Sequence, residues 1–164
     1  MTLVILTSCL LVVATTVIHY EVLRALNAGL PALGIPSRAT LVVVILTTFV
    51  AHAIEIAMYG AVMYVLGAWV EVGSLKGSNG PTLAACMYFS AETYTSLGFG
   101  DVTPVGPIRL VAGVEALNGL LLIGWSASFT YISMERFWRV GPENLHTAPA
   151  HAQQARGPID APSP

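Results

Sequence analysis

MYFSAETYTSLGFGDVTP, residues 87–104, is the segment that constrains the rest of this chain most strongly. It overlaps an apolar run at residues 82–94, which spans about three helical turns and is too short to cross a bilayer. Gly98 and Gly100 follow, separated by one residue. Glycine adopts positive φ at no steric cost, so alternating glycines can turn successive carbonyls to one side of an extended strand. This order predicts a re-entrant loop, which membranes tolerate only where it lines water or is buried in protein.

The composition places the chain in a membrane. Of its 164 residues, 55% are hydrophobic and only 10% are charged, and the mean hydropathy is +0.71. Soluble domains carry about 25% charged residues because their surfaces face water. Three apolar segments, residues 2–23, 38–69 and 105–138, each exceed the roughly 20 residues that a transmembrane helix needs. A signal peptide carries a basic residue before its apolar run, and the first segment has none. We therefore expect it to be a retained span.

Basic residues near the ends of the spans predict the orientation of the chain. Arg24 and Arg38 bracket the loop between the first two spans, and Arg136 and Arg139 lie at the end of the third. Positive residues concentrate on the cytoplasmic side of membrane proteins. We therefore expect the N-terminus to lie outside and the C-terminus in the cytoplasm.

The predicted strand suits a monovalent cation. A column of carbonyls facing one axis can replace the hydration shell of such an ion. The side chains of Leu97 and Phe99 are then expected to point away, into the surrounding protein. The preceding short helix ends near Tyr94, where the partial negative charge of its C-terminus favours a cation.

The segment at residues 87–104 closely resembles the pore loop of potassium channels, whose filter reads TVGYGD after a short helix that bears aromatic residues. The resemblance covers residues 59–138 and leaves out the first span and the tail. It implies a bacterial-type channel in the plasma membrane, with potassium held by the backbone carbonyls of Ser96, Leu97, Gly98 and Phe99. The positions that match the filter pattern are Ser96, Leu97, Gly98, Phe99, Gly100 and Asp101.

The expected fold is an all-α integral membrane protein with three transmembrane helices and one re-entrant pore helix. A filter closes around its axis with four loops and this chain has one, so we expect a homotetramer. The predicted parts are an extra N-terminal helix at residues 1–25, a pore domain at 38–138 and a disordered cytoplasmic tail at 140–164. Within the pore domain we expect an outer helix at 38–70, an outer loop at 71–81, a pore helix at 82–94 capped by Thr82, a filter at 95–101 and an inner helix at 105–138.

Three positions of the filter differ from the pattern. Phe99 replaces tyrosine, Leu97 replaces valine, and Ser96 replaces threonine while keeping a hydroxyl. None of these changes adds a charge or removes a carbonyl, so a passive potassium-selective channel is the leading interpretation. The alternatives are a weakly selective monovalent cation channel and a non-conducting accessory or sensor subunit.

Glu92, Thr95 and Asp101 are expected to support the filter. The resemblance implies that Glu92 and Asp101 share a proton or a water behind it, because two close carboxylates cannot both ionise cheaply. In the alternative, Glu92 bonds a backbone amide or a tyrosine hydroxyl, and Asp101 faces water.

In the third span, Gly119 lies nineteen residues after Gly100. It is a candidate hinge of the inner helix, or a site of close helix packing. Asn118 beside it either faces the cavity or bonds a neighbouring helix. Ser126, Ser128 and Thr130 lie about two turns deeper, where a cytoplasmic gate is expected.

Ionisable residues inside membrane spans are costly and carry a functional hypothesis by default. His52 and Glu55 share one helix face, and we expect one of them to bond Glu115 or another buried partner. The alternative is proton sensing by His52. His19 and His52 are expected to lie about 10 Å apart in depth, which argues against a metal site. His19 and Glu21 are expected near the cytoplasmic edge, where they can snorkel.

Several classes of function are excluded or disfavoured. The net charge of −2 does not suggest a nucleic-acid partner. Cys9 and Cys86 lie in separate apolar segments and predict neither a disulfide nor a metal site. No span carries the repeated basic residues of a voltage sensor, and no nucleophile–base motif suggests an enzyme. We expect no cofactor other than potassium as the permeant ion.

Overall fold

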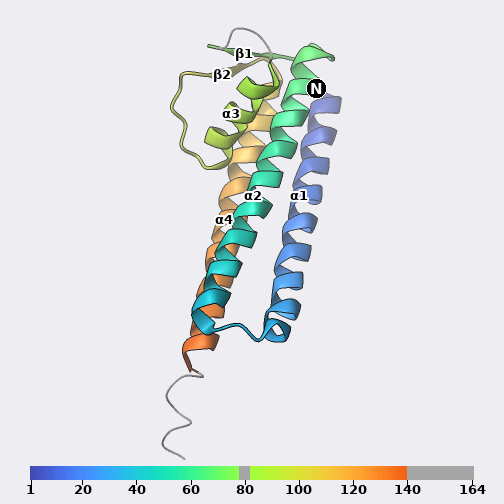
Figure 1. The fold of residues 1–164 in the computed structure, drawn as a ribbon. Helices are drawn as coiled ribbons and strands as arrows, with labels where there is room; N and C mark the ends of the chain where they lie inside the picture. The colour runs from blue at the N-terminus through green and yellow to red at the C-terminus, as the bar shows by residue number, and fades with distance from the viewer. Residues whose placement is uncertain (78–81, 140–164) are drawn as a thin grey trace, which may run out of the picture.

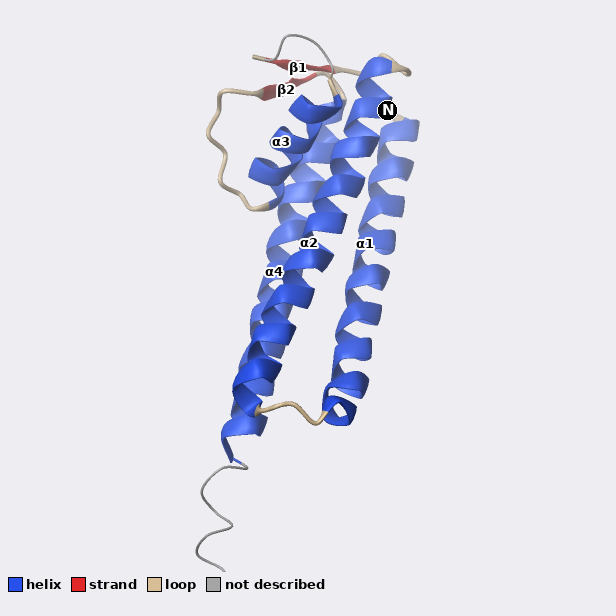
Figure 2. Cartoon of the chain, in the orientation of Figure 1, coloured by secondary structure: helices blue, strands red, loops and turns tan. Residues whose placement is uncertain are grey.

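The computed structural model describes residues 1–77 and 82–139. The tail predicted at residues 140–164 lies outside this part of the chain. Helices account for most of the described residues, as Figure 2 shows. Three of them are long and apolar enough to cross a membrane. The prediction of an all-α integral membrane fold is therefore confirmed.

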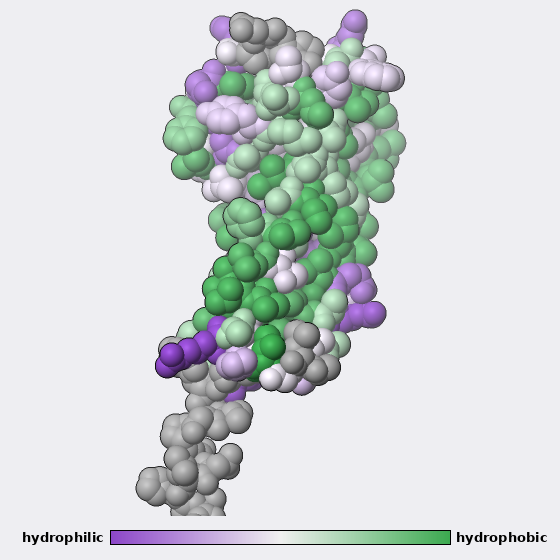
Figure 3. All heavy atoms as spheres, in the orientation of Figure 1, coloured by the Kyte–Doolittle hydropathy of each residue, from purple (hydrophilic) through white to green (hydrophobic). Residues whose placement is uncertain are grey.

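The three long helices lie side by side along the length of the molecule (Figure 1). They are α1 (Thr2–Gly29), α2 (Ser37–Ala68) and α4 (Ile108–Arg139). Large apolar side chains such as Leu10 and Phe49 are exposed on their outer faces. In the face of the molecule drawn in Figure 3, hydrophobic residues cover most of the region between the two ends. Such a surface suits lipid, because water would have to solvate every one of these side chains.

The first helix is longer than the sequence suggested. We expected it to end by residue 25, but α1 continues to Gly29 and into a 3-10 turn, η1 (Leu30–Leu33). Glu21 and Arg24 do not interrupt it, because they form an exposed ion pair with each other at 3.2 Å. One stripe of α1 is buried, and its members recur every three or four residues: Val4, Ser8, Leu11, Thr15, His19, Leu23 and Leu26.

The short helix α3 (Leu83–Tyr94) lies at the end of the bundle that also holds the N-terminus (Figure 1). It begins as predicted, because the Thr82 hydroxyl accepts a hydrogen bond from the N–H of Ala85 at 3.2 Å. The helix packs closely on α2 at Gly60, where an added Cβ would lie 2.8 Å from the sulfur of Met87. At twelve residues it goes only part of the way through a membrane.

A two-stranded antiparallel sheet was not anticipated. Strands β1 (Ser74–Lys76) and β2 (Thr103–Val105) pair antiparallel, with Leu75 opposite Pro104. The predicted outer loop therefore contains a strand, and the inner helix begins at Ile108 instead of residue 105. The turn at Gly77 requires glycine, since its φ is +97° and an added Cβ would lie 2.0 Å from the carbonyl oxygen of Asp101.

Gly119 lies where α4 meets the end of α3. An added Cβ there would lie 2.3 Å from the Tyr94 carbonyl oxygen and 2.9 Å from Cγ of the Tyr94 ring. This close approach gives Gly119 a packing role, and the hinge stays a prediction.

Replacing Gly119 by alanine should therefore lower the free energy of unfolding by about 1–3 kcal/mol, because backbone atoms must move to admit the methyl group. Gly113→Ala is the matched control, since no atom lies within 4 Å of its added Cβ. Unfolding of both variants in detergent micelles, followed by helical circular dichroism, measures the difference. Equal stabilities would contradict the packing role.

Candidate functional site

The loop between α3 and β2 has the backbone geometry that the alternating glycines predict. Gly98 has a φ of +56° and Gly100 a φ of +80°. Ser96 also lies in the left-handed region, with a φ of +57°. A serine in that region is uncommon, and no pattern in the sequence predicts it.

The beginning of the loop folds back on the end of α3. The N–H groups of Leu97 and Gly98 both donate to the carbonyl of Glu92, at 2.8 and 3.2 Å. The Thr95 hydroxyl donates to the carbonyl of Ala91 at 2.7 Å. The two bonds to Glu92 satisfy a carbonyl that the last turn of a helix otherwise leaves free. The loop is thereby held at the C-terminal end of α3.

Leu97 and Phe99 do not point into protein within one chain. Their side chains are 59% and 66% exposed, and Figure 1 shows the loop on the side of the bundle opposite α1. The chain's own residues do not bury these side chains, and their burial in surrounding protein stays a prediction. Exposed apolar side chains of this size on one loop mark a surface that another molecule covers.

Glu92 and Asp101 each have a partner of their own. Glu92 is buried, and its Oε2 accepts a hydrogen bond from the N–H of Phe99 at 3.3 Å. Asp101 accepts one from the Tyr88 hydroxyl at 3.0 Å and one from the N–H of Val102 at 3.0 Å. The bond of Glu92 matches the backbone-amide alternative, and the shared proton stays a prediction. Both acids thus hold the loop in place.

Asn118 bonds neighbouring helices. Its side-chain amide donates to the Thr15 hydroxyl of α1 at 2.8 Å and to the Tyr59 hydroxyl of α2 at 3.2 Å, and the residue is buried. The second of the two alternatives for Asn118 therefore matches the contacts. This side chain joins α1, α2 and α4 at one point.

Glu115 has a different partner from the one expected. Its Oε1 accepts a hydrogen bond from the Ser90 hydroxyl of α3, and the residue is fully buried. Glu115 is therefore not the partner of His52 or Glu55; the other expectation, another buried partner, is met by the contact of Glu55 with His19 of α1. Glu115 thus ties α3 to α4.

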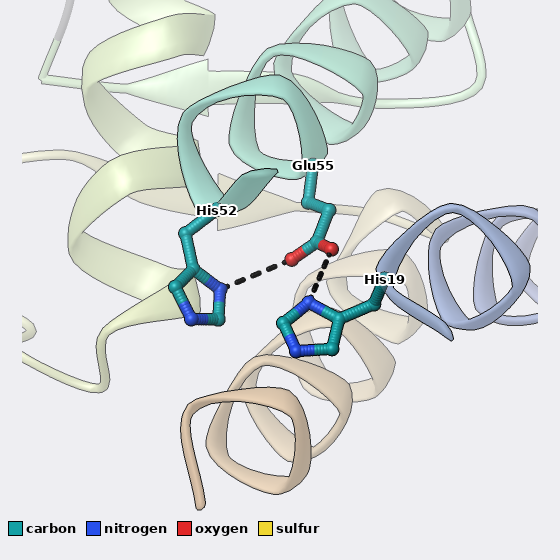
Figure 4. Close-up of side chains that lie close together, drawn as sticks. All are labelled: His19, His52 and Glu55. Carbon is teal, nitrogen blue, oxygen red and sulfur yellow. Dashed lines mark hydrogen bonds and ion pairs between the residues drawn. The ribbon is translucent and has the colours of Figure 1, made fainter. Parts of the chain in front are cut away.

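Four polar side chains from three helices form what we call the buried polar cluster: His19, His52, Glu55 and Ser126. Nδ1 of His19 lies 2.9 Å from Oε1 of Glu55, and Nδ1 of His52 lies 3.1 Å from Oε2. Figure 4 shows the two rings meeting the same carboxylate from different helices. The ring centroids are 5.1 Å apart.

This arrangement corrects the expected position of His19. We placed it near the end of its span and about 10 Å in depth from His52, whereas α1 continues for ten residues beyond it to Gly29. Because α1 is longer, His19 lies further from the α1–α2 connection than expected. It is therefore level with α2 residues that also lie further from that connection. His19 is fully buried and does not snorkel, while Glu21 does lie at the surface.

The cluster also reaches α3. The Tyr94 hydroxyl donates to Oε2 of Glu55 and lies 2.9 Å from Nδ1 of His52. Tyr94 is the last residue of α3 and directly precedes Thr95. The buried polar cluster is therefore one residue removed from the loop.

Ser126 closes the cluster on the side of α4. Its Oγ lies 3.0 Å from Nε2 of His52 and 3.0 Å from Nε2 of His19. A hydroxyl has one proton and two lone pairs, so Ser126 can donate to one ring and accept an N–H from the other, or accept an N–H from both. Ser126 was expected to lie at the gate, and here it is buried between helices.

Ser126→Ala should lower the free energy of unfolding by about 1–2 kcal/mol, because it leaves two buried ring nitrogens without their partner. The matched control is Ser128→Ala, whose hydroxyl donates to the Gly124 carbonyl of its own helix. That variant should change stability by less than about 0.5 kcal/mol. Denaturation in mixed micelles compares the two, and equal effects would contradict a bridging role for Ser126.

Comparison with known protein families agrees with this arrangement of helices and loop. A family model described as an ion channel matches residues 39–136, which is more than half of the chain. The match includes α2, α3, the loop and nearly all of α4, and it leaves out α1. Searches of curated proteins and of solved structures found no match. The chain belongs to this ion-channel family and is a multi-pass membrane protein.

Proposed function

We propose that the chain is one subunit of a passive, potassium-selective channel. The observation that carries the proposal is the loop after a half-length helix, with positive φ at both Gly98 and Gly100. These φ values let successive carbonyls face one side, where they replace the water around a potassium ion. The carbonyls of Ser96, Leu97, Gly98 and Phe99 are the proposed ion ligands. The C-terminus of α3 adds partial negative charge below them.

The same proposal requires four chains. One loop supplies one side of a filter, so four copies around an axis complete it. The exposure of Leu97 and Phe99 supports this, because the neighbouring subunits would cover them. The outward-facing Leu117, Leu120 and Leu121 of α4 are further apolar surface on the inner helix.

We propose that the loop faces the outside and the α1–α2 connection faces the cytoplasm. Figure 1 places the N-terminus, α3 and the two-stranded sheet at one end of the bundle, with the α1–α2 connection at the other. Three arginines lie toward the end of the bundle that holds the α1–α2 connection: Arg24 near the end of α1, Arg38 at the start of α2 and Arg136 near the end of α4. The excess of positive charge at that end supports a cytoplasmic location.

Membership of an ion-channel family assigns the chain a transport-type activity. We propose that conduction follows the electrochemical gradient without an enzymatic step or a cofactor. A weakly selective cation channel is the alternative, favoured only by Leu97 and Ser96 in place of valine and threonine.

Potassium should permeate the purified protein in planar bilayers far better than sodium. Reversal potentials in potassium–sodium gradients measure this directly, and equal permeabilities would favour the weakly selective alternative. Gly98→Ala should abolish current, because its φ of +56° costs an alanine roughly 1–2 kcal/mol in each subunit. Gly113→Ala, in α4, is the matched control and should still conduct.

Chemical cross-linking of the protein in micelles should give a ladder that ends at four chains. The physical reason is that four loops are needed to surround one ion path. Gel electrophoresis and mass measurement of the intact complex provide the count. A ladder ending at two chains would rule out the tetramer.

A further inference from the structure

We propose that the buried polar cluster is a binding site for a divalent transition-metal ion of the zinc type. The protein ligands are His19, His52 and Glu55. Each offers one ligand atom, and the three atoms lie within 4.8 Å of one another. Two imidazoles and one carboxylate are a ligand set that binds zinc in proteins. Imidazole ligands also favour zinc and its neighbours over magnesium and calcium.

The distances suit a tetrahedral ion. Zinc binds histidine nitrogen and carboxylate oxygen at about 2.0–2.2 Å, which places neighbouring ligands about 3.4 Å apart. Nδ1 of His19 and of His52 lie 2.9 and 3.1 Å from the two oxygens of Glu55. Both rings turn their Nδ1 atoms toward the carboxylate in Figure 4. Small movements of three side chains would therefore admit the ion.

A fourth donor lies beside these three. The Tyr94 hydroxyl lies 2.9 Å from Nδ1 of His52 and donates to Oε2 of Glu55. This hydroxyl, or a water bonded to it, can complete four-coordination. The ligand set then draws on α1, α2 and α3.

Ser126 supplies the outer partner that a metal-bound histidine needs. A histidine that binds a metal through one nitrogen donates its other N–H to an oxygen, which fixes the ring. With the ion at both Nδ1 atoms, both Nε2–H groups would donate to Oγ of Ser126, at 3.0 Å each. A hydroxyl oxygen can accept two hydrogen bonds. The metal therefore gives all four ring nitrogens a partner with both histidines neutral.

Burial and location favour a dedicated site. The His19 and Glu55 side chains are 0% exposed and His52 is 17% exposed, so the cluster is largely enclosed by the chain. Buried charges in proteins are paired or coordinate metals. His19 lies outside residues 39–136, so the site depends on a helix that the family match does not include. An ion there would fasten α1 to the helix that precedes the filter.

Zinc binding to the full-length chain in detergent micelles tests the proposal. The chain has four histidines, so the background is Cys9→Ser/His146→Ala/His151→Ala, which leaves His19 and His52 as its only histidines. Equilibrium dialysis against Zn²⁺, followed by elemental analysis, should give about one zinc per chain. His19→Gln and Glu55→Gln should each weaken binding by at least about 100-fold. Ser126→Ala should weaken it by about 10- to 100-fold, and Ser128→Ala should leave it unchanged.

Co²⁺ is a second probe. Its spectrum is measured on the background protein itself, so this result does not depend on whether the ligand variants fold. The background protein should give the intense visible absorption of tetrahedral cobalt, and X-ray absorption should show two imidazole ligands. Zinc below about 0.1 per chain, or a weak octahedral cobalt spectrum, would mean a hydrogen-bonded cluster only and would overturn the proposal. Zinc retained by the His19→Gln/His52→Gln double variant would also overturn it.

Discussion

The carboxylate of Glu55 is the point on which the arrangement of the helices depends. It is fully buried and bonds His19 of α1, His52 of its own helix and Tyr94 of α3. A buried charge that loses its partners costs several kcal/mol, so separating these groups would destabilise the fold. Apolar packing alone would not set the register of membrane helices, because lipid is as apolar as leucine. The polar contacts of Glu55, together with those of Asn118 and Glu115, therefore distinguish this helix register from a slipped one.

The same contacts set the position of the loop between α3 and β2. Tyr94 bonds Glu55 through its hydroxyl, and its backbone carbonyl lies against Gly119 with no room for a side chain. The end of α3 is thus fixed both to α2 and to α4. Because the N–H groups of Leu97 and Gly98 bond back to this end, the strand that follows starts from a rigid base. The bonds of Glu92 and Asp101 then hold its middle and far end.

The local features were predictable from the sequence and the distant contacts were not. The half-length helix, its Thr82 cap and the special backbone at Gly98 depend on neighbouring residues, whose preferences can be read directly. The meeting of His19 with His52 depends on where α1 ends and how it pairs with α2. Charged residues suggested an earlier end, but Glu21 pairs with a neighbour on the exposed face. The two-stranded sheet was not predicted because its strands have three residues each and one contains proline.

The position of α1 limits how it can influence conduction. Figure 1 shows it on the far side of α2 and α4 from the loop, so it does not line the proposed ion path of this subunit. Most of its buried stripe is apolar and would slide or repack at little cost. Two of its side chains form hydrogen bonds to other helices that lead toward the pore: Thr15, which accepts from Asn118 of α4, and His19 in the buried polar cluster. A change in the state of His19 would act on Tyr94 through Glu55, or through Ser126 and His52, and Tyr94 directly precedes the proposed filter. A signal that α1 carries through His19 should therefore pass through the buried polar cluster, whether the bound cation is a proton or a metal ion.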